Sequence, residues 1–462
     1  MTNDFSNTRR AFLATAAAAT TAMTAAAKEK IIKPGISAKS AGRTLGANDR
    51  IRVGMIGVGI MGTGHLREFV KQSDADKDIE VVAVSDVYKR HRERAQGISK
   101  LDAKNIVLDY REVLGRSDVD AVLIATPDHW HAQMAIDAFA AGKDVYLQKP
   151  MTMTHAEGVL LREAVVKSGR IFQLGSQQRS SPQFRRACEL VRSGRVGRLQ
   201  RVEIGLPIDP TAPDNAPQAV PPQLAYERWL GPTPQAPYTE QRVHPVDGYD
   251  RPGWLRNDAY CLGMITGWGA HHYDILHWAL DTELGGPLTI EGRADFPANK
   301  IWNVHGAYEV QLTYPGQVRV TVSDKLPNGL KFIGDEGWIF VSRGSVATKD
   351  PKVPRGRLRP LDASDDKLLD PKGVAVQLPQ SSEHHENWLE CVRSRRAPMV
   401  PAPVAHRSNT ACIVSWIAMK LGRRLTWDAR AERFVDDAAA NAMLTRPERA
   451  PYGALRLAAA RG

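Results

Sequence analysis

The stretch IRVGMIGVGIMGTGHLREFVKQ, residues 51–72, decides the fold. It starts as a run of branched aliphatic residues that predicts a strand, and it ends with apolar residues at helical spacing. The G-x-G-x-x-G pattern between them fits a strand-to-helix turn. The first glycine allows the tight turn, the second lets the backbone approach a pyrophosphate, and the third lets the helix pack closely. The free N–H groups at the start of the helix would face the phosphates. The stretch therefore predicts a dinucleotide site that includes Gly57, Gly59, Ile60, Met61 and Gly62.

A carboxylate ends the next predicted strand, EVVAVSD, residues 80–86. Asp86 lies 24 residues after Gly62, close to the spacing at which an acid binds the ribose of the adenosine. Its negative charge would repel a 2′-phosphate, so the sequence favours NAD over NADP. Three basic residues follow closely and would attract that phosphate, which keeps NADP as the alternative. They are Lys89, Arg90 and Arg92.

Short apolar runs alternate with amphipathic helical stretches over residues 50–175, which predicts a parallel sheet covered by helices on both faces. Beyond residue 176 the predicted strands lengthen, as in AYEVQLTYPG and QVRVTVSD, and indicate an open antiparallel sheet. We expect an α/β protein with an N-terminal Rossmann dinucleotide-binding domain over 50–175. A C-terminal α+β domain with an open, mainly antiparallel sheet would cover 176–440, and a tail would cover 441–462.

The N-terminus carries an ordered pattern of charged, apolar and small residues. Arg9 and Arg10 precede Phe12-Leu13 and a run of Ala and Thr, which fits a twin-arginine export signal over residues 1–27. A polar linker would follow over 28–49. The alternative is an Ala-rich tail with a chance pair of arginines. Export predicts a periplasmic or otherwise exported protein whose partner is the twin-arginine machinery, and the run is too short for a stable membrane span.

Composition excludes other classes of protein. The chain has 462 residues, 43% of them hydrophobic and 24% charged, as expected of a globular protein with a sizeable core. The net charge of +11 is scattered along the chain, whereas nucleic-acid binders cluster basic residues on one element. Four cysteines show no C-x-x-C spacing, so buried free thiols are expected.

Two further motifs lie at the predicted ends of parallel strands, where such sheets bind ligands. They are ATPDHWHA, residues 125–132, and YLQKPMT, residues 146–152. Lys149 precedes a proline, which holds it extended at a strand end, where its amine can stabilise oxyanion charge as hydride leaves. These motifs add six residues to the expected cofactor site: Thr126, Pro127, His129, His131, Gln148 and Lys149.

These motifs together resemble the glucose–fructose oxidoreductase, inositol dehydrogenase and MocA family. The likeness extends through GSQQRSSPQFRRACELVRSGRVG and GMITGWGAHHYDILHWAL into the second domain. The resemblance implies a Rossmann domain, an α/β domain whose open sheet often mediates homo-oligomers, and sugar or polyol substrates.

The chain departs from the family pattern at two positions. Gln148 replaces the usual Glu before the lysine, which removes one influence that keeps the amine charged. Gly267 stands where the family often has a catalytic Asp, while His271 is retained, and we expect this histidine to act as general acid/base. Its expected helpers are His272, Asp274 and Tyr260, although His272 and Asp274 could equally satisfy backbone groups.

Substrate contacts are expected from side chains of both domains. The expected set is Lys149, Gln178, Trp254, Trp268, His271 and Asp274. A metal site formed by His271, His272, Asp274 and His277 is disfavoured, because adjacent His side chains point apart on regular secondary structure.

An exported nicotinamide enzyme must carry its cofactor with it, so we expect tightly bound NAD that each turnover returns to its starting state. Two reactions meet this requirement. One oxidises a carbinol of a sugar, polyol or glycoside and reduces a second carbonyl compound. The other is a redox-neutral glycoside hydrolysis through oxidation, elimination, water addition and re-reduction. An inactive carbohydrate-binding protein is the third hypothesis, and retention of Lys149 and His271 argues against it.

Overall fold

A computed structural model describes residues 50–75, 79–244, 251–351, 353, 356–381 and 383–459. The predicted export signal and linker, residues 1–49, lie outside these ranges. Within them, no helix combines the length and the apolar character that crossing a membrane would require.

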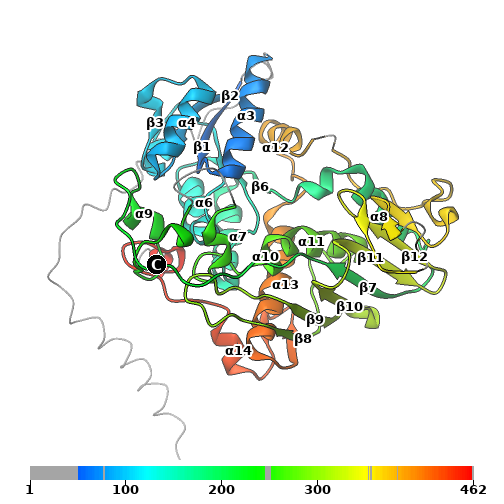
Figure 1. The fold of residues 1–462 in the computed structure, drawn as a ribbon. Coiled ribbons are helices and arrows are strands. Elements are labelled where there is room, and N and C mark those ends of the chain that lie inside the picture. The colour runs from blue at the N-terminus through cyan, green and yellow to red at the C-terminus, as the bar shows by residue number, and fades with distance from the viewer. Residues whose placement is uncertain are drawn as a thin grey trace, which may run out of the picture. The chain divides into compact units, whose positions relative to one another are not determined.

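The N-terminal part of the described chain is a parallel sheet of six strands in the order β3-β2-β1-β4-β5-β6 (Figure 1). This order is that of dinucleotide-binding folds, which bind their ligand where the strand order reverses, between β1 and β4. The strands are β1 (Ile51–Ile56), β2 (Ile79–Ser85), β3 (Ile106–Val107), β4 (Ala121–Ile124), β5 (Asp144–Leu147) and β6 (Phe172–Leu174). Their helices are α3 (Ile60–Asp74), α4 (Lys89–Ser99), α5 (Tyr110–Leu114), α6 (His131–Ala140) and α7 (His155–Ser168).

The second sheet has nine strands, in the order β15-β12-β11-β7-β10-β9-β8-β16-β17. Every neighbouring pair is antiparallel except β7 and β10, as the sequence predicted. The strands are β7 (Leu199–Gly205), β8 (Thr289–Ala294), β9 (Tyr308–Thr313), β10 (Arg319–Ser323), β11 (Gly329–Gly334), β12 (Trp338–Val341), β15 (Leu361–Ala363), β16 (Leu425–Asp428) and β17 (Arg433–Phe434). A separate hairpin pairs β13 (Val346–Ala347) with β14 (Arg357–Leu358).

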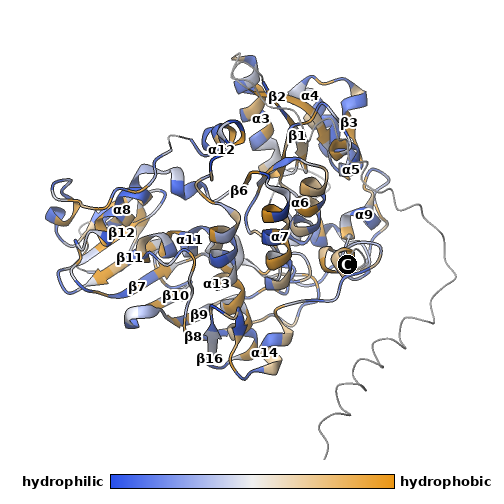
Figure 2. Ribbon diagram, turned by 180° about the vertical axis from the view of Figure 1, so that it is seen from behind, coloured by the Kyte–Doolittle hydropathy of each residue, from blue (hydrophilic) through white to orange (hydrophobic). Residues whose placement is uncertain are grey.

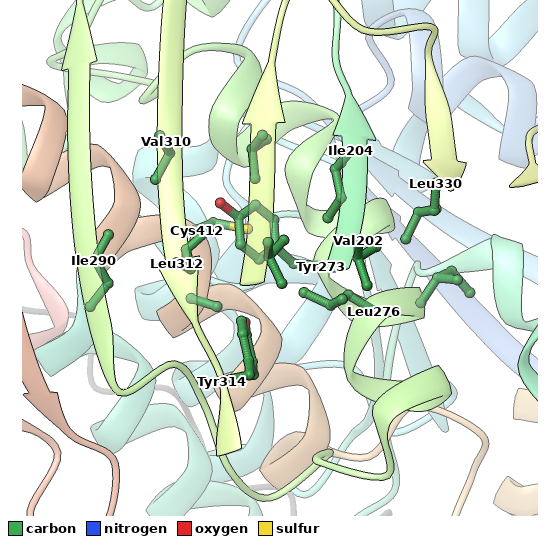
Figure 3. Close-up of a cluster of buried hydrophobic side chains, with 14 of the residues drawn as sticks. Val202, Ile204, Tyr273, Leu276, Ile290, Val310, Leu312, Tyr314, Leu330 and Cys412 are labelled. Carbon is green, nitrogen blue, oxygen red and sulfur yellow. The ribbon is translucent and has the colours of Figure 1, made fainter. Parts of the chain in front are cut away.

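Helices α8 (Pro182–Arg192), α11 (Gly269–Leu280) and α13 (Ala402–Leu421) pack with this sheet around one apolar core. Alternate strand residues point toward α11, where Tyr273 and Leu276 meet them (Figure 3). Helices in both parts of the chain carry apolar and polar segments, as expected of helices buried on one side (Figure 2). Packing in this core fixes the position of α11, whose first residue, Gly269, lies two positions after Gly267.

The C-terminal part of the chain returns to the first sheet. Trp388 of α12 (His384–Ser394) stacks on Phe69 with ring centroids 6.3 Å apart. Helix α15 (Ala454–Ala459) lies in the segment expected as a tail and contacts α6 and α7. Tyr452, just before it, packs edge-on against Trp130. The helix α14 (Ala438–Ala442) instead packs beside β17.

Candidate active site

The glycine turn between β1 and α3 has the geometry that a pyrophosphate site needs. Gly57 has φ +81°, a conformation that side chains rarely adopt. A Cβ on Gly62 would collide with the carbonyl oxygen of Gly57, so this residue must be glycine for the helix to approach the turn. A Cβ on Gly59 would meet no atom within 4 Å. The space above Gly59 therefore suits a ligand rather than a packing partner.

Two alanine substitutions separate these roles. We expect Gly59→Ala to fold like the wild type but to bind NADH at least about tenfold more weakly, because its methyl group occupies the space for the phosphates. Gly62→Ala should lower the free energy of unfolding by about 1–3 kcal/mol, because its Cβ overpacks the turn. Urea unfolding and NADH fluorescence titration measure the two effects. A Gly59→Ala protein that binds NADH normally would exclude this turn as the cofactor site.

Asp86 lies beside the same turn and is held there as an anion. Its carboxylate accepts hydrogen bonds from the N–H groups of Val58 and Tyr88, both at 2.9 Å, and lies 3.2 Å from Nδ1 of His91. Burial alone would raise the pKa of Asp86, but His91 and the two N–H groups outweigh it and lower the pKa to about 2. Asp86 is thus ionised at neutral pH, as the proposed preference for NAD requires.

The lowered pKa of Asp86 predicts an acid-dependent loss of stability. Because the folded value of about 2 lies below the ordinary 3.8, the contribution is complete above pH 3.8 and disappears as the pH falls through 2. It amounts to about 2 kcal/mol. We expect the free energy of unfolding of Asp86→Asn, measured in urea across this range, to fall less steeply with acid than that of the wild type. Parallel slopes for the two proteins would contradict this prediction.

A cavity of about 420 Å³ runs from the glycine turn toward the second sheet. Both parts of the chain line it, which is typical of a site for a small molecule or cofactor. Near the turn it is lined by Gly57, Gly59, Ile60, Met61 and Asp86, at the strand ends by Thr126, Pro127, Asp128, Gln148 and Lys149, and from the second domain by Trp229, His244, Trp254, Gly267 and Trp268. Gly62 lies behind the turn.

Lys149 is a partly buried cation on the wall of this cavity. Its Nζ donates a hydrogen bond to the carbonyl oxygen of Gly267 at 3.1 Å. Burial lowers the pKa of the amine, and the carboxyl of Asp128 opposes this by raising it. Gly267 also lines the cavity, and a Cβ there would meet no atom within 4 Å. The position where the family often carries an acid is therefore open space facing the cavity.

Asp128 is a cavity residue that the sequence reasoning missed. It begins a short 3₁₀ turn, Asp128–Trp130, directly after β4 and is 4% exposed. Burial raises its pKa to about 7, although Lys149 and Cys261 oppose that rise. Its position after a strand end, one strand away from Lys149, was the signal available in the sequence.

His271 and His272 lie on α11 but not among the residues that line the cavity. Burial lowers the pKa of His271 well below the ordinary value, and its Nδ1 has no hydrogen-bond partner among the described residues. Nε2 of His272 donates to Oδ1 of Asn328 at 2.9 Å, and burial lowers its pKa to about 4. His271 therefore remains a prediction as acid/base, whereas His272 is engaged within the fold.

Gln178 connects these histidines to a guanidinium at the end of β12. Its amide donates to the carbonyl oxygen of His271 at 3.2 Å and accepts from Nε of Arg343 at 3.3 Å. Arg343 in turn lies 4.6 Å over the ring of Trp268. Gln178 thus orients neighbouring groups and does not itself line the cavity. Trp254 and Trp268 do line it, as expected of residues that stack on a sugar.

Asp274 lies apart from the cavity, in a buried ion pair. Its two oxygens accept from Nε and Nη2 of Arg179 at 2.7 and 2.8 Å, and both side chains are 2% exposed or less. Arg179 also contacts Glu283 at 2.5 Å. Asp274 is paired with Arg179 and does not line the cavity, so its role as a substrate contact stays a prediction. Nε2 of His277, further along the same helix, lies 2.9 Å from the hydroxyl of Tyr314.

Three expected residues form the wall behind the cavity. Nε2 of His129 donates to the carbonyl oxygen of Trp229 at 2.9 Å, and Tyr260 packs against both of their rings. Neither His129 nor Tyr260 lines the cavity. His131 lies between the carbonyl oxygens of Pro150, at 2.7 Å from Nδ1, and Thr126, at 3.0 Å from Nε2. It therefore positions the two strand ends instead of contacting the cofactor itself.

Gln148 does line the cavity, and its amide contacts Nε2 of His65 on α3. Burial lowers the pKa of His65 to about 3, so this histidine is neutral and accepts from the amide. Gln148 therefore gives Lys149 a neutral neighbour in the chain.

Another group of side chains lies close enough together, among the described residues, to hold a metal ion. His155, His406 and Glu432 have ligand atoms within 4.8 Å of one another. Glu432, however, also contacts Arg162 and Arg407, both at 2.9 Å. These two guanidinium groups supply the positive charge that a cation would, so the group is an ion-pair cluster. All four cysteines are buried and free.

Comparison with known families agrees with this site. Residues 51–176 match the NAD-binding Rossmann fold of the GFO/IDH/MocA oxidoreductase family. Residues 212–344 and 355–454 match the C-terminal alpha/beta domain of the same family. The chain belongs to the GFO/IDH/MocA oxidoreductase family. The resemblance stated from the sequence, the α/β fold and the N-terminal NAD-binding domain are thereby confirmed.

Individual relatives within the GFO/IDH/MocA family cover part of the chain. Inositol 2-dehydrogenase of Salmonella typhimurium is 29% identical over 211 residues, which are 46% of this chain and 56% of that protein. A glycosyl hydrolase family 109 protein of Shewanella baltica is 34% identical over 163 residues, 32% of this chain and 35% of that protein. The chain thus spans between about a third and just over half of the length of these relatives.

Solved structures share the fold at lower identity. The WlbA dehydrogenase from Bordetella pertussis, crystallised with NADH and UDP-GlcNAcA, has a TM-score of 0.59 at 16% identity. The likeness covers 82% of this chain and 99% of that chain. It supports the two-sheet fold assigned here to the GFO/IDH/MocA protein.

Proposed function

We propose that the protein is an NAD(P)-dependent oxidoreductase that transfers hydride at a carbinol of a sugar, polyol or glycoside. The observation that supports this proposal most is the partly buried amine of Lys149, which lines the same cavity as the glycine turn. A bound NAD supplies the hydride acceptor. The Lys149 amine would donate to the carbinol oxygen and stabilise the charge that develops there. Trp254 and Trp268 would offer their faces to the carbohydrate.

The cofactor is proposed to stay bound through turnover. Residues 223–244 are here named the strap. They contact the residues that directly follow β2 of the first sheet. The N–H of Lys89 donates to the carbonyl oxygen of Gln223 at 2.8 Å, and the N–H of Ala225 donates to that of Val87 at 3.1 Å. From the strap, Trp229 and His244 line the cavity. We propose that these contacts hold the strap against the bound nucleotide and slow its release.

Redox-neutral glycoside hydrolysis is the second candidate. It is favoured by the relative of glycosyl hydrolase family 109. The missing acid at Gly267 fits an altered proton pathway but does not choose between the two reactions. A catalytically silent carbohydrate-binding protein is less favoured. Such a protein would gain nothing from burying the Lys149 charge, which costs stability.

A nucleotide assay and a substrate panel test the proposal. Mass spectrometry of the denatured, purified protein is expected to show a nicotinamide dinucleotide near one per chain. Net oxidoreduction of free sugars or polyols would support the first candidate. Release of nitrophenol from nitrophenyl glycosides, without net change in nicotinamide absorbance, would support the second. A protein that binds neither NADH nor NADPH would exclude both.

Location and assembly are parts of the same proposal. The Arg9-Arg10 pattern supports export by the twin-arginine route, and expression with Arg9 and Arg10 replaced by lysine would then leave the protein in the cytoplasm. Family resemblance supports a homo-oligomer, which light scattering would reveal by a mass above the 50.9 kDa of the chain.

A further inference from the structure

We propose that Asp128 is the proton-holding partner of Lys149, in place of the acid that is missing at Gly267. This inference rests on the proposed function, because it assigns the fate of the proton that leaves the carbinol. Two observations carry it: the location of the carboxyl and the absence of an ion-pair partner for it among the described residues. Its electrostatic effect on Lys149 supports them.

The carboxyl of Asp128 reaches the cavity from the strand next to that of Lys149. Strands β4 and β5 are parallel neighbours, and Ile124 pairs with Leu147, so their two following loops end at the same edge. Asp128 is 4% exposed and lines the cavity. Its Oδ2 is buried without a hydrogen-bond partner among the described residues. The thiol of Cys261 lowers the pKa of this carboxyl.

Electrostatics couple Asp128 to Lys149. Burial raises the pKa of Asp128 to about 7 and lowers the pKa of Lys149. The charged and titratable groups that act on the carboxyl are Lys149, Cys261 and Arg446. Burial also raises the pKa of the Cys261 thiol well above its ordinary value, so this thiol stays protonated. Transfer of a proton from Lys149 to Asp128 would leave the net charge of the cavity unchanged.

The step balances with the oxidised nicotinamide as electron acceptor. The O–H bond of the carbinol breaks, and its proton passes to the amine of Lys149 as that amine gives a proton to the carboxylate of Asp128. The C–H bond of the same carbon breaks, its electron pair leaves as hydride for the nicotinamide, and the C=O bond forms. A later reduction reverses each transfer, so the buried carboxyl keeps the proton within the site between the two halves of the cycle.

Other candidates for this role fit less well. Gly267 has no side chain, and His271 does not line the cavity. Asp209 is also buried, but it is paired with Arg251 at 3.1 Å and does not line the cavity. Asp128 is therefore the carboxyl best placed to exchange a proton with Lys149. Asp209 provides the matched control, because it is a buried acid that does not contribute to the pKa of Lys149.

The test compares Asp128→Asn with Asp209→Asn. We expect Asp128→Asn to lower kcat by about 10²–10⁴-fold and to remove an inflection near pH 7 from the pH profile of kcat, whereas Asp209→Asn keeps that inflection. The pKa of Lys149 in nucleotide-free protein provides a readout that does not depend on turnover. It is obtained from the rate of Lys149 acetylation as a function of pH, with the acetylated residue identified by mass spectrometry. Asp128→Asn should lower this pKa, because the carboxylate raises it in the wild type.

An unchanged pH profile, or an unchanged pKa of Lys149, would overturn the assignment. If the protein proves to have no oxidoreductase activity, the proposed function fails, but the shift in acetylation still tests the coupling of the pair. If Asp128→Asn does not fold, Cys261→Ala provides the second variant. Because the thiol lowers the pKa of Asp128, its removal should move the inflection to higher pH, and an inflection that stays in place would contradict the proposal.

Discussion

Replacing Lys149 by methionine should reduce turnover by about 10²–10⁴-fold while nucleotide binding persists. Lys149 lines the cavity, and its amine donates to the carbonyl oxygen of Gly267. Loss of the amine removes the proposed donor to the carbinol oxygen. The glycine turn and Asp86, which bind the nucleotide in this account, are untouched. Steady-state kinetics and NADH titration on the same preparation measure the two effects separately.

Stability provides the control for this variant. Burial of Lys149 lowers its pKa, which means that the fold bears a cost for the buried charge. Lys149→Met should therefore melt at the temperature of the wild type or above it, as expected where a site sacrifices stability for function. A variant that loses turnover only because it unfolds would show a lower melting temperature. A stable variant with full turnover would remove Lys149 from the mechanism.

The largest expected effect on stability follows from the buried pair of Arg179 and Asp274. Both side chains are 2% exposed or less, and two hydrogen bonds join them. Arg179→Met leaves the Asp274 carboxyl buried without its partner, so we expect the free energy of unfolding to fall by about 3–5 kcal/mol. Urea unfolding measures this loss.

A double variant separates a structural role from a role in substrate binding. Arg179→Met with Asp274→Leu removes both charges and should recover most of the lost stability, because an apolar pair replaces the ion pair. KM should remain near the wild-type value in this protein, since neither side chain lines the cavity. A loss below about 1 kcal/mol for Arg179→Met, as for surface pairs, would contradict the structural role. A KM that rises about tenfold in a stable double variant would restore Asp274 as a substrate contact.

The cofactor half of the site could be predicted because its geometry is local. The three glycines and Asp86 belong to one strand-turn-helix-strand unit, so their spacing alone determines how they meet. The sheet order around them follows from the alternation of strands and helices. The ends of β4 and β5 were predictable for the same reason, and Lys149 lies where that reasoning placed it.

The substrate half depends on contacts between distant segments. Asp274 meets Arg179 from 95 residues away, and nothing in the motif HHYD reveals that partner. His129 similarly finds the carbonyl oxygen of Trp229, 100 residues away, so its position in ATPDHWHA gave no sign that it faces away from the cavity. Asp128 was not predicted, because its neighbours Pro127 and His129 were the residues assigned to the cofactor site. The end of a parallel strand is nevertheless where an acid of the site is expected.

A crystal structure of the protein with NADH tests the central claim most directly. The account predicts density for a dinucleotide in the cavity, with its pyrophosphate against Gly59, its adenosine ribose on Asp86, and its nicotinamide ring beside the amine of Lys149. Nucleotide bound elsewhere, or a nicotinamide ring on the far side of the cavity from Lys149, would contradict it.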